Sequence, residues 1–297
     1  MTSIQLLKHN IQKISFKQIG WTILTLNLLL IVYFVFIIQQ SDEFLFAFDN
    51  TFYTFIAIGF CAQLIDGALG MAYGASSSSL LLHFGVSPKI ASASVHMAEV
   101  FTTGVSGLSH LKFKNIDKKL LIKLVIPGVI GAVVGAYLLS AVLDGGFIKP
   151  YISAYLLILG ILILLKGIRN NFKKHKKVRK AGLLALVGGM FDALGGGGWG
   201  PIVTSNILNQ GKDPRLTIGT VNTAEFFVTF FATGVFLFYV GVDSWQVVLG
   251  LIIGGVLAAP LGALVASKIN KRLLMIVVSL VIILTSSLNI YNSFIGG

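Results

Sequence analysis

The chain has 297 residues, of which 55% are hydrophobic and only 11% are charged. Soluble globular chains carry about 25% charged residues, so this composition excludes a soluble domain. The formal net charge is +12, but the basic residues lie between apolar runs, where they report membrane orientation and not a nucleic-acid partner.

The chain divides into five parts in sequence order. Residues 1–18 alternate apolar with basic positions, which predicts an amphipathic cytoplasmic tail at the membrane surface. Residues 19–40 are expected to form an extra transmembrane helix. Two repeats follow, at 52–165 and 181–295, and the basic linker 166–180 between them is expected to contact anionic lipid.

Seven apolar runs are long enough to be read as membrane crossings. They are residues 19–38, 90–111, 120–143, 151–165, 216–240, 246–266 and 273–290. Two further runs, 52–84 and 181–208, are interrupted by glycine. If these two enter the membrane and return to the same side, all 23 Lys and Arg residues except Lys89 and Lys149 fall on one side. The positive-inside rule therefore predicts seven crossings and two re-entrant hairpins, with a cytoplasmic N-terminus.

The two repeats share the same residues at one constant offset. Asp66 and Asp192 are 126 positions apart, and the strings "SPKIASASVHMAEVFTT" (87–103) and "DPRLTIGTVNTAEFFVT" (213–229) align at that offset without a gap. Each repeat would contain a hairpin and three crossings, an odd number, so the copies are inverted relative to each other. The predicted fold is an all-α polytopic membrane protein of two inverted repeats, with the hairpin tips meeting near the midplane.

The hairpin tips are the predicted binding site for a small anion. Runs of glycine unwind a helix, and the returning half-helices, starting near Ala75 and Pro201, would aim free amide groups at the tip. Such helix N-termini bind anions. The candidate substrate-binding residues are Asp66, Gly70, Gly74, Ser76, Ser77, His96, Asp192, Gly196, Gly197, Gly198, Trp199, Gly200, Thr204 and Asn222. Two structural roles are alternatives to anion binding. The glycines could instead allow close helix packing, and the two aspartates could instead cap the broken helices.

Glu99 and Glu225 are the candidate proton-coupling residues. Glu99 shares one helix face with His96, Thr103, Ser106 and His110, which step by three and four residues. A charged residue at the bilayer centre costs at least ~2.5–3.5 kcal/mol, so repeated acids there predict a function. A carboxylate near the site would repel a bound anion. Protonation of Glu99 or Glu225 as the anion binds would remove this repulsion.

The tip sequences resemble those of the sulfite exporter TauE/SafE family of membrane permeases. The resemblance covers approximately residues 55–290 and rests on "DGALGMAYGASSSS" (66–79), "DALGGGGWGPIVTS" (192–205) and the strings that follow them. It implies a carrier for small anions such as sulfite or an organosulfonate in the cytoplasmic membrane. The first copy has Ala75 where the second has Pro201, so the two tips differ chemically.

Two rival functions remain at this stage. One is a cation/proton exchanger that uses the repeated acids as ligands. The other is a membrane-embedded hydrolase that uses Ser76–Ser79 with His96 or His110, although no GxSxG turn supports it. The sequence contains no metal-ligand cluster and no nucleotide-binding fingerprint, so we expect no cofactor, no metal and no enzyme activity.

Overall fold

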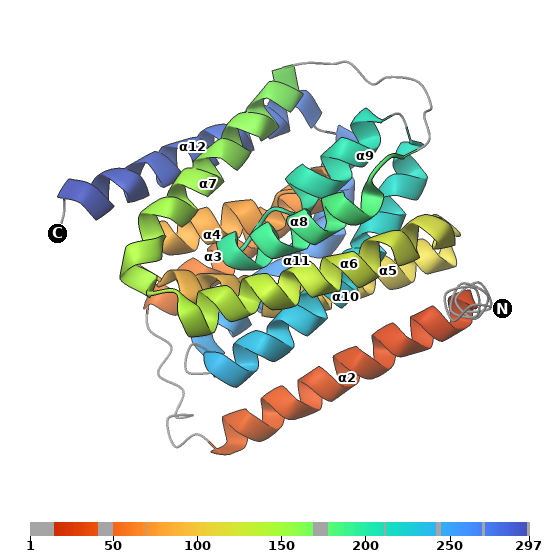
Figure 1. Cartoon of the computed structure of the whole chain (residues 1–297), viewed down its shortest axis with the longest axis horizontal. Helices are drawn as coiled ribbons and strands as arrows, with labels where there is room; N and C mark the ends of the chain where they lie inside the picture. The colour runs from red at the N-terminus through yellow and green to blue at the C-terminus, as the bar shows by residue number, and fades with distance from the viewer. Residues whose placement is uncertain are drawn as a thin grey trace.

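The computed structural model describes residues 15–40, 50–69, 71–168, 178–210, 212–241, 245–268 and 271–295. Throughout these ranges the regular structure is helical (Figure 1). The helices are α2 (Phe16–Gln40), α3 (Asn50–Leu69), α4 (Tyr73–His83), α5 (Pro88–Lys112), α6 (Lys118–Tyr137), α7 (Gly145–Ile168), α8 (Ala181–Gly195), α9 (Ser205–Asn209), α10 (Pro214–Tyr239), α11 (Trp245–Lys268) and α12 (Lys271–Ile295). Two π-helical turns, η1 (Leu138–Val142) and η2 (Gly200–Thr204), extend α6 and precede α9.

The long helices confirm a polytopic α-helical membrane protein. Five segments are long and apolar enough to cross a bilayer: Phe16–Phe36, Lys118–Val142, Gly145–Ile168, Pro214–Tyr239 and Arg272–Phe294. They correspond to five of the seven predicted crossings. Helix α5 is as long, with 25 residues, but it carries the polar stripe and is less apolar. In α11 the apolar stretch among described residues is shorter, Trp245–Ala258.

The internal repeat is visible in the helix starts. Pro88 and Pro214, 126 positions apart, are the first residues of α5 and α10. Proline suits this position because its missing N–H has no partner in the first turn. The residue before each proline, Ser87 or Asp213, caps the helix by accepting a hydrogen bond from the backbone N–H three residues later. Both copies therefore start this helix by the same device.

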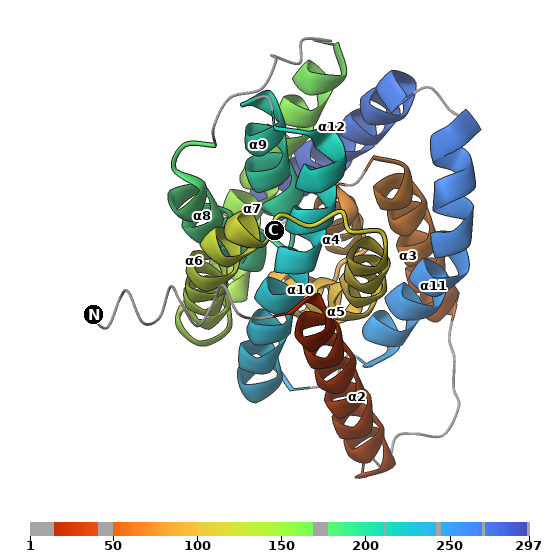
Figure 2. The same ribbon diagram turned by 90° about the vertical axis from the view of Figure 1, so that its right-hand side faces the viewer.

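Helices α5 and α10 pack against each other at the centre of the bundle, with α6 and α8 on one side and α3 and α11 on the other (Figure 2). The Asn222 amide of α10 donates to Ser106 Oγ of α5 at 3.0 Å. Nearer the start of α5, the His96 ring lies 5.6 Å from that of Phe236, near the end of α10. The earlier residue of α5 thus contacts the later residue of α10. These two equivalent helices are therefore antiparallel.

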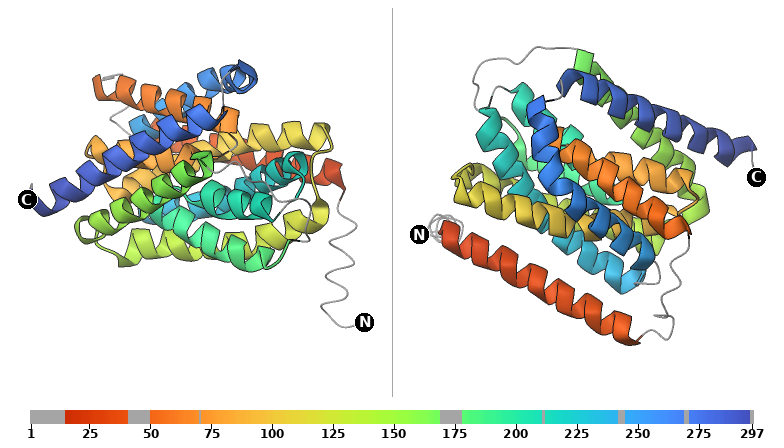
Figure 3. Two further views of the ribbon diagram at one scale, coloured as in Figure 1. Left: turned by 90° about the horizontal axis from the view of Figure 1, so that it is seen from above. Right: turned by 180° about the vertical axis from the view of Figure 1, so that it is seen from behind.

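The other pair of equivalent long helices, α7 and α12, is arranged in the same way (Figures 1 and 3). A Cβ added to Gly160 would lie 3.0 Å from Ile283, and one added to Gly167 would lie 3.1 Å from Met275. The contacts again run in opposite directions along the two helices. The pairs α3–α11 and α8–α6 are also matched, since each joins the first helix of one repeat to the fourth of the other.

Helix α2 lies outside this arrangement (Figure 3). It packs mainly on α5, where Asn27 approaches Gly104 and Gly20 lies near Leu108. Many of its large apolar side chains, such as Trp21 and Leu28, are exposed, as expected for a helix that faces lipid. Most of the predicted amphipathic tail (residues 1–14) lies outside the described residues. So does most of the predicted basic linker (residues 169–177).

Asp117 joins the two repeats at the start of α6. Its carboxylate accepts hydrogen bonds from the N–H groups of Lys119 and Leu120 and pairs with Lys212 Nζ at 2.7 Å. Partial burial alone would raise the pKa of Asp117. The hydrogen bond from Lys212 and the two backbone N–H groups outweigh that effect and hold the pKa below its usual value.

Replacing Asp117 should destabilise the protein in a pH-dependent way. Asp117→Asn keeps the cap and loses the ion pair, which should lower the free energy of unfolding by less than about 1 kcal/mol. Asp117→Ala loses the cap as well, for about 1 kcal/mol more. Because the folded pKa is depressed, the charge stabilises the protein above the unfolded value near 3.8, and this stabilisation is lost as the pH falls through the folded pKa. The free energy of unfolding in detergent, measured at several pH values, checks this. The same difference between wild type and Asp117→Asn at every pH would contradict it.

Candidate functional site

The two glycine-rich tips are in direct contact. Helix α3 ends at Leu69 and α4 begins at Tyr73, while α8 ends at Gly195 and η2 begins at Gly200. A Cβ added to Gly197 would overlap the backbone of Gly74 and Ala75. The main chains of the two tips are in contact at Gly197. Glycine is therefore required there because a side chain would not fit, and not only because glycine interrupts a helix.

Side-chain hydrogen bonds hold the tips together. Ser78 Oγ, in α4, donates to the carbonyl of Gly196 at 2.6 Å. Gly196 needs to be glycine because it ends α8 with a φ of 66°. Ser92 Oγ, in α5, donates to the carbonyl of Ala193 at 2.6 Å. Buried hydroxyl groups of the first repeat therefore satisfy carbonyls that the break in the second repeat leaves free.

Asp192 caps the returning helix of the second repeat, and Asp66 occupies the equivalent position in the first. Asp192 Oδ1 accepts a hydrogen bond from the N–H of Trp199 at 2.9 Å. The Asp66 carboxylate lies near the backbone N–H of Tyr73, which is 126 positions before Trp199. The capping alternative that the sequence left open is therefore present in the structure. One amide donor at the helix start of the second repeat is thus already occupied by a carboxylate.

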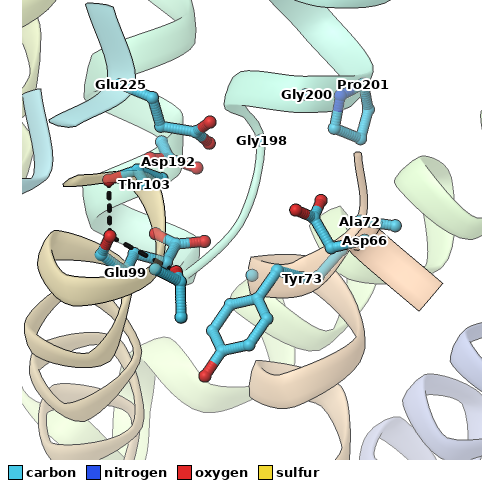
Figure 4. Close-up of a pocket in the computed structure, with 13 residues that line it drawn as sticks. Asp66, Ala72, Tyr73, Glu99, Thr103, Asp192, Gly198, Gly200, Pro201 and Glu225 are labelled. Atoms are coloured by element: carbon cyan, nitrogen blue, oxygen red, sulfur yellow. Dashed lines mark hydrogen bonds between the residues drawn. The ribbon is translucent and has the colours of Figure 1, made fainter. Parts of the chain in front are cut away.

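The tips enclose a small cavity on the side where α5 and α10 approach (Figure 4). Its lining residues are Asp66, Ala72, Tyr73, Gly74, Ala75, Glu99, Thr102, Thr103, Asp192, Gly198, Gly200, Pro201 and Glu225. It has room for about one water molecule. A sulfite or larger anion needs more space than this, so the tips must separate for such a solute to enter.

The four repeated acids face one another across this cavity. Asp66 and Glu225 are partly buried, and Glu99 and Asp192 are almost fully buried. None of the described lining residues is Lys or Arg. Four carboxylates this close repel one another, and their charge must be balanced by protons or by a cation.

The structure therefore brings part of the predicted site together. Asp66, Gly74, Asp192, Gly198 and Gly200 line the cavity with the two predicted coupling residues. Thr103, on the polar stripe, also lines it and donates to the carbonyl of Glu99. Gly70 lies outside the described residues.

Other predicted binding residues have different positions. Ser76 Oγ donates to the carbonyl of Ala72 at 2.7 Å, within its own helix. The Trp199 indole is fully buried and donates to the carbonyl of Val221. Asn222 donates to Ser106, and Ser77 and Thr204 are buried away from the lining set. None of these five side chains is among the residues that line the cavity.

Tyrosines at the site were missed by the sequence reasoning. Tyr73 lines the cavity, and its buried hydroxyl has no hydrogen-bond partner. Tyr155, from α7, places its hydroxyl against Gly198, and its ring stacks on Phe191. The signal for Tyr73 was its position at the start of the half-helix, aligned with Trp199. Nothing in the sequence places Tyr155 near the tip.

Lys166, near the end of α7, contacts residues next to the tips. Its Nζ donates to Ser205 Oγ at 3.0 Å and lies 3.4 Å from Met71 Sδ. Met71 lies in turn against Gly200, where an added Cβ would be 2.8 Å from Met71 Cβ. Lys166 is thus one layer of side chains from the cavity, and we name Lys166, Ser205 and Met71 the lysine seal.

The serine of the first repeat that is equivalent to Ser205 has only uncharged partners among the described residues. Ser79, 126 positions earlier, pairs through its Oγ with Thr285 Oγ1 at 2.9 Å. The Asn289 amide donates to the Ser79 carbonyl at 3.2 Å. We name Ser79, Thr285 and Asn289 the hydroxyl seal. The two repeats therefore close equivalent contacts with different chemistry.

Comparison with known proteins identifies the family. The sequence profile described as "Sulfite exporter TauE/SafE" matches residues 55–288. The "Probable membrane transporter protein YtnM" of Bacillus subtilis (strain 168) is 46% identical over 251 residues, which cover 82% of this chain and 83% of that protein. No solved structure matches.

Proposed function

Because the chain belongs to the sulfite exporter TauE/SafE family, we propose that it is a secondary transporter that moves small oxyanions across the cytoplasmic membrane. Sulfite and organosulfonates are the substrates proposed, since the family description names a sulfite exporter. The relative's name, a probable membrane transporter, supports transport over an enzyme activity. The observation that carries the proposal is the contact between the two glycine tips beside four acids that line one cavity.

The proposed architecture is a pair of inverted repeats with re-entrant hairpins and a cytoplasmic N-terminus. The antiparallel packing of α5 on α10 and of α7 on α12 supports it, since equivalent helices of inverted repeats run in opposite directions. The interruptions at 71–72 and 196–198 support hairpins, because broken backbone at membrane depth is tolerated only inside protein or along a cavity.

In the proposed mechanism the anion enters between the tips when they separate. The N-terminal ends of α4 and η2 point at this space and carry partial positive charge. The carboxylates of Asp66 and Asp192, which line this space, would rotate away or be neutralised as the anion binds. Gly74, Gly198 and Gly200 leave backbone within reach of the solute because they carry no side chain.

Glu225 is the proposed proton-coupling residue. Glu99 lies with Asp192 beside the base His96, with ligand atoms within 4.8 Å of one another. Glu225 lines the cavity but does not belong to that group of three described residues, so we assign a proton to it as compensation for its charge. The role that the sequence predicts for Glu99 stays a prediction.

Replacing Glu225 by glutamine should uncouple transport from pH. Glutamine keeps the shape of a protonated glutamate but cannot release a proton, so a pH gradient should no longer drive anion flux. The measurement is uptake of labelled sulfite, sulfate and sulfoacetate into proteoliposomes, with and without a gradient. Asp144→Asn, at an exposed loop acid, is the matched control and should behave as wild type. Full pH dependence in Glu225→Gln would refute the role.

A cation exchanger is the second candidate, because the cavity wall has four carboxylates and, among described residues, no Lys or Arg. The same proteoliposomes test it with labelled calcium. Calcium flux without any oxyanion movement would favour the exchanger and overturn the proposed substrate.

A further inference from the structure

Three buried side chains beside the cavity have polar atoms without a hydrogen-bond partner. They are His96 Nε2, Glu99 Oε2 and Asp192 Oδ2. The three residues are at most 4% exposed. A buried polar atom without a partner costs about 1–3 kcal/mol, and more when the group is charged. Three such atoms around one point need a common explanation.

The orientation of His96 is fixed by its other ring nitrogen. Nδ1 lies 2.9 Å from the carbonyl oxygen of Ser92, and a carbonyl can only accept, so Nδ1 carries a proton. The Ser92 hydroxyl gives its own proton to Ala193 and cannot donate to the ring. With that proton on Nδ1, a neutral His96 ring has its free lone pair on Nε2, the atom that faces Asp192 Oδ2.

Asp192 is oriented by a similar contact. Its Oδ1 is held by the N–H of Trp199 at 2.9 Å, which leaves Oδ2 directed at His96 Nε2, 3.4 Å away. Two acceptor atoms facing each other repel unless a proton or a cation lies between them. A charged N–H···O hydrogen bond is about 2.7–2.9 Å long, shorter than the distance found here.

The separation fits two ligands of one metal ion. Zinc lies about 2.0–2.1 Å from an imidazole nitrogen and about 2.0–2.2 Å from a carboxylate oxygen, and a tetrahedral angle then puts these ligand atoms about 3.4 Å apart. Ligand histidines characteristically donate their second N–H to a carbonyl or carboxylate, as His96 does to Ser92. Glu99, one helical turn after His96, offers a third ligand atom within 4.8 Å of the others.

We propose that His96, Glu99 and Asp192 bind a divalent transition-metal ion, with zinc as the representative, at the point where α5 meets the tip of the second repeat. Imidazole with carboxylates suits zinc and its neighbours better than calcium or magnesium, which prefer oxygen ligands alone. Three protein ligands leave a fourth position open. The ion would balance two of the four acids, and the site stands independently of which solute is transported.

Metal binding to the full-length protein in detergent tests this directly. After treatment with a chelator, isothermal titration with Zn²⁺ should show one ion bound per chain, and Co²⁺ should give the visible absorption of a tetrahedral site. His96→Gln and Glu99→Gln should each weaken binding by at least tenfold. His83→Gln, at an exposed histidine, is the matched control and should bind as wild type.

Asp192→Asn keeps an oxygen for the N–H of Trp199 and therefore preserves the helix cap, while it removes the charged ligand. It should also bind zinc at least tenfold more weakly, and its melting temperature without metal checks that it is folded. Zinc should raise the melting temperature of wild type and of the control but not of the three ligand variants. No binding to wild type, or equal binding to wild type and His96→Gln, would overturn the site. Neither result depends on anion flux, so the proposed function is judged separately.

Discussion

Replacing Gly197 by alanine is expected to reduce anion transport at least tenfold and to destabilise the protein by about 1–3 kcal/mol. The added Cβ would overlap the backbone of Gly74 and Ala75. No side-chain rotation can relieve an overlap with main-chain atoms, so the two tips must move apart. That movement would also strain the Ser78 hydrogen bond to Gly196, which joins the same tips.

A second glycine gives the control for this prediction. Gly234 lies inside α10, and a Cβ added there meets nothing within 4 Å. Gly234→Ala should leave flux unchanged and stabilise the helix by up to about 1 kcal/mol. Thermal unfolding in detergent and sulfite flux in proteoliposomes measure both effects. Wild-type melting and flux in Gly197→Ala would mean that the tips do not hold the contact described here.

Removing the charge of Lys166 is expected to raise the half-saturation concentration for the anion about tenfold. A hydrogen bond to a charged group contributes about 1.5–3 kcal/mol, and about 1.4 kcal/mol is a factor of ten in affinity. The ammonium in the lysine seal lies one layer from the cavity, so it would meet an anion before the tips do. Lys166→Gln should therefore impair anion capture more than the maximal rate.

Lys119→Gln is the control for the lysine prediction. Lys119 is exposed at the start of α6, on the same proposed cytoplasmic side, but it does not belong to the seal. The Lys119→Gln variant loses one positive charge but leaves the residues beside the cavity unchanged. Its half-saturation concentration for the anion should therefore match wild type. Lys166→Arg, which keeps the charge, should retain most of the affinity. Equal behaviour of Lys166→Gln and Lys119→Gln would mean that only net charge matters.

The sequence predicted the elements of the fold well because the chain repeats them. Pro88 and Pro214 start equivalent helices, and the glycines after Asp66 and Asp192 precede equivalent helix starts. The returning helices begin at Tyr73 and near Trp199, about two residues earlier than expected. Such signals are local, since a cap or a break depends on residues within one or two turns.

The use of individual polar side chains at the site was less predictable. Ser76 belongs to the same short helix as Ser78, yet one bonds to its own helix and the other to the opposite tip. That difference depends on which helix face meets the second repeat, and the spacing of serines along the chain does not encode it. Lys166 was counted as one of several linker charges, because its contact with Ser205 joins residues 39 positions apart.

If the lysine seal and the hydroxyl seal face opposite sides of the membrane, as the proposed inverted repeats require, an anion meets different chemistry from each side. The Lys166 ammonium can exchange Ser205 for an arriving oxyanion and pair with it as a full charge, whereas the hydroxyl groups of Ser79 and Thr285 can offer it only weaker hydrogen bonds. Loading would then be faster from one compartment than from the other. Microscopic reversibility still requires the final concentration ratio to follow the driving gradients alone, so the asymmetry belongs to rates and saturation and not to the end point.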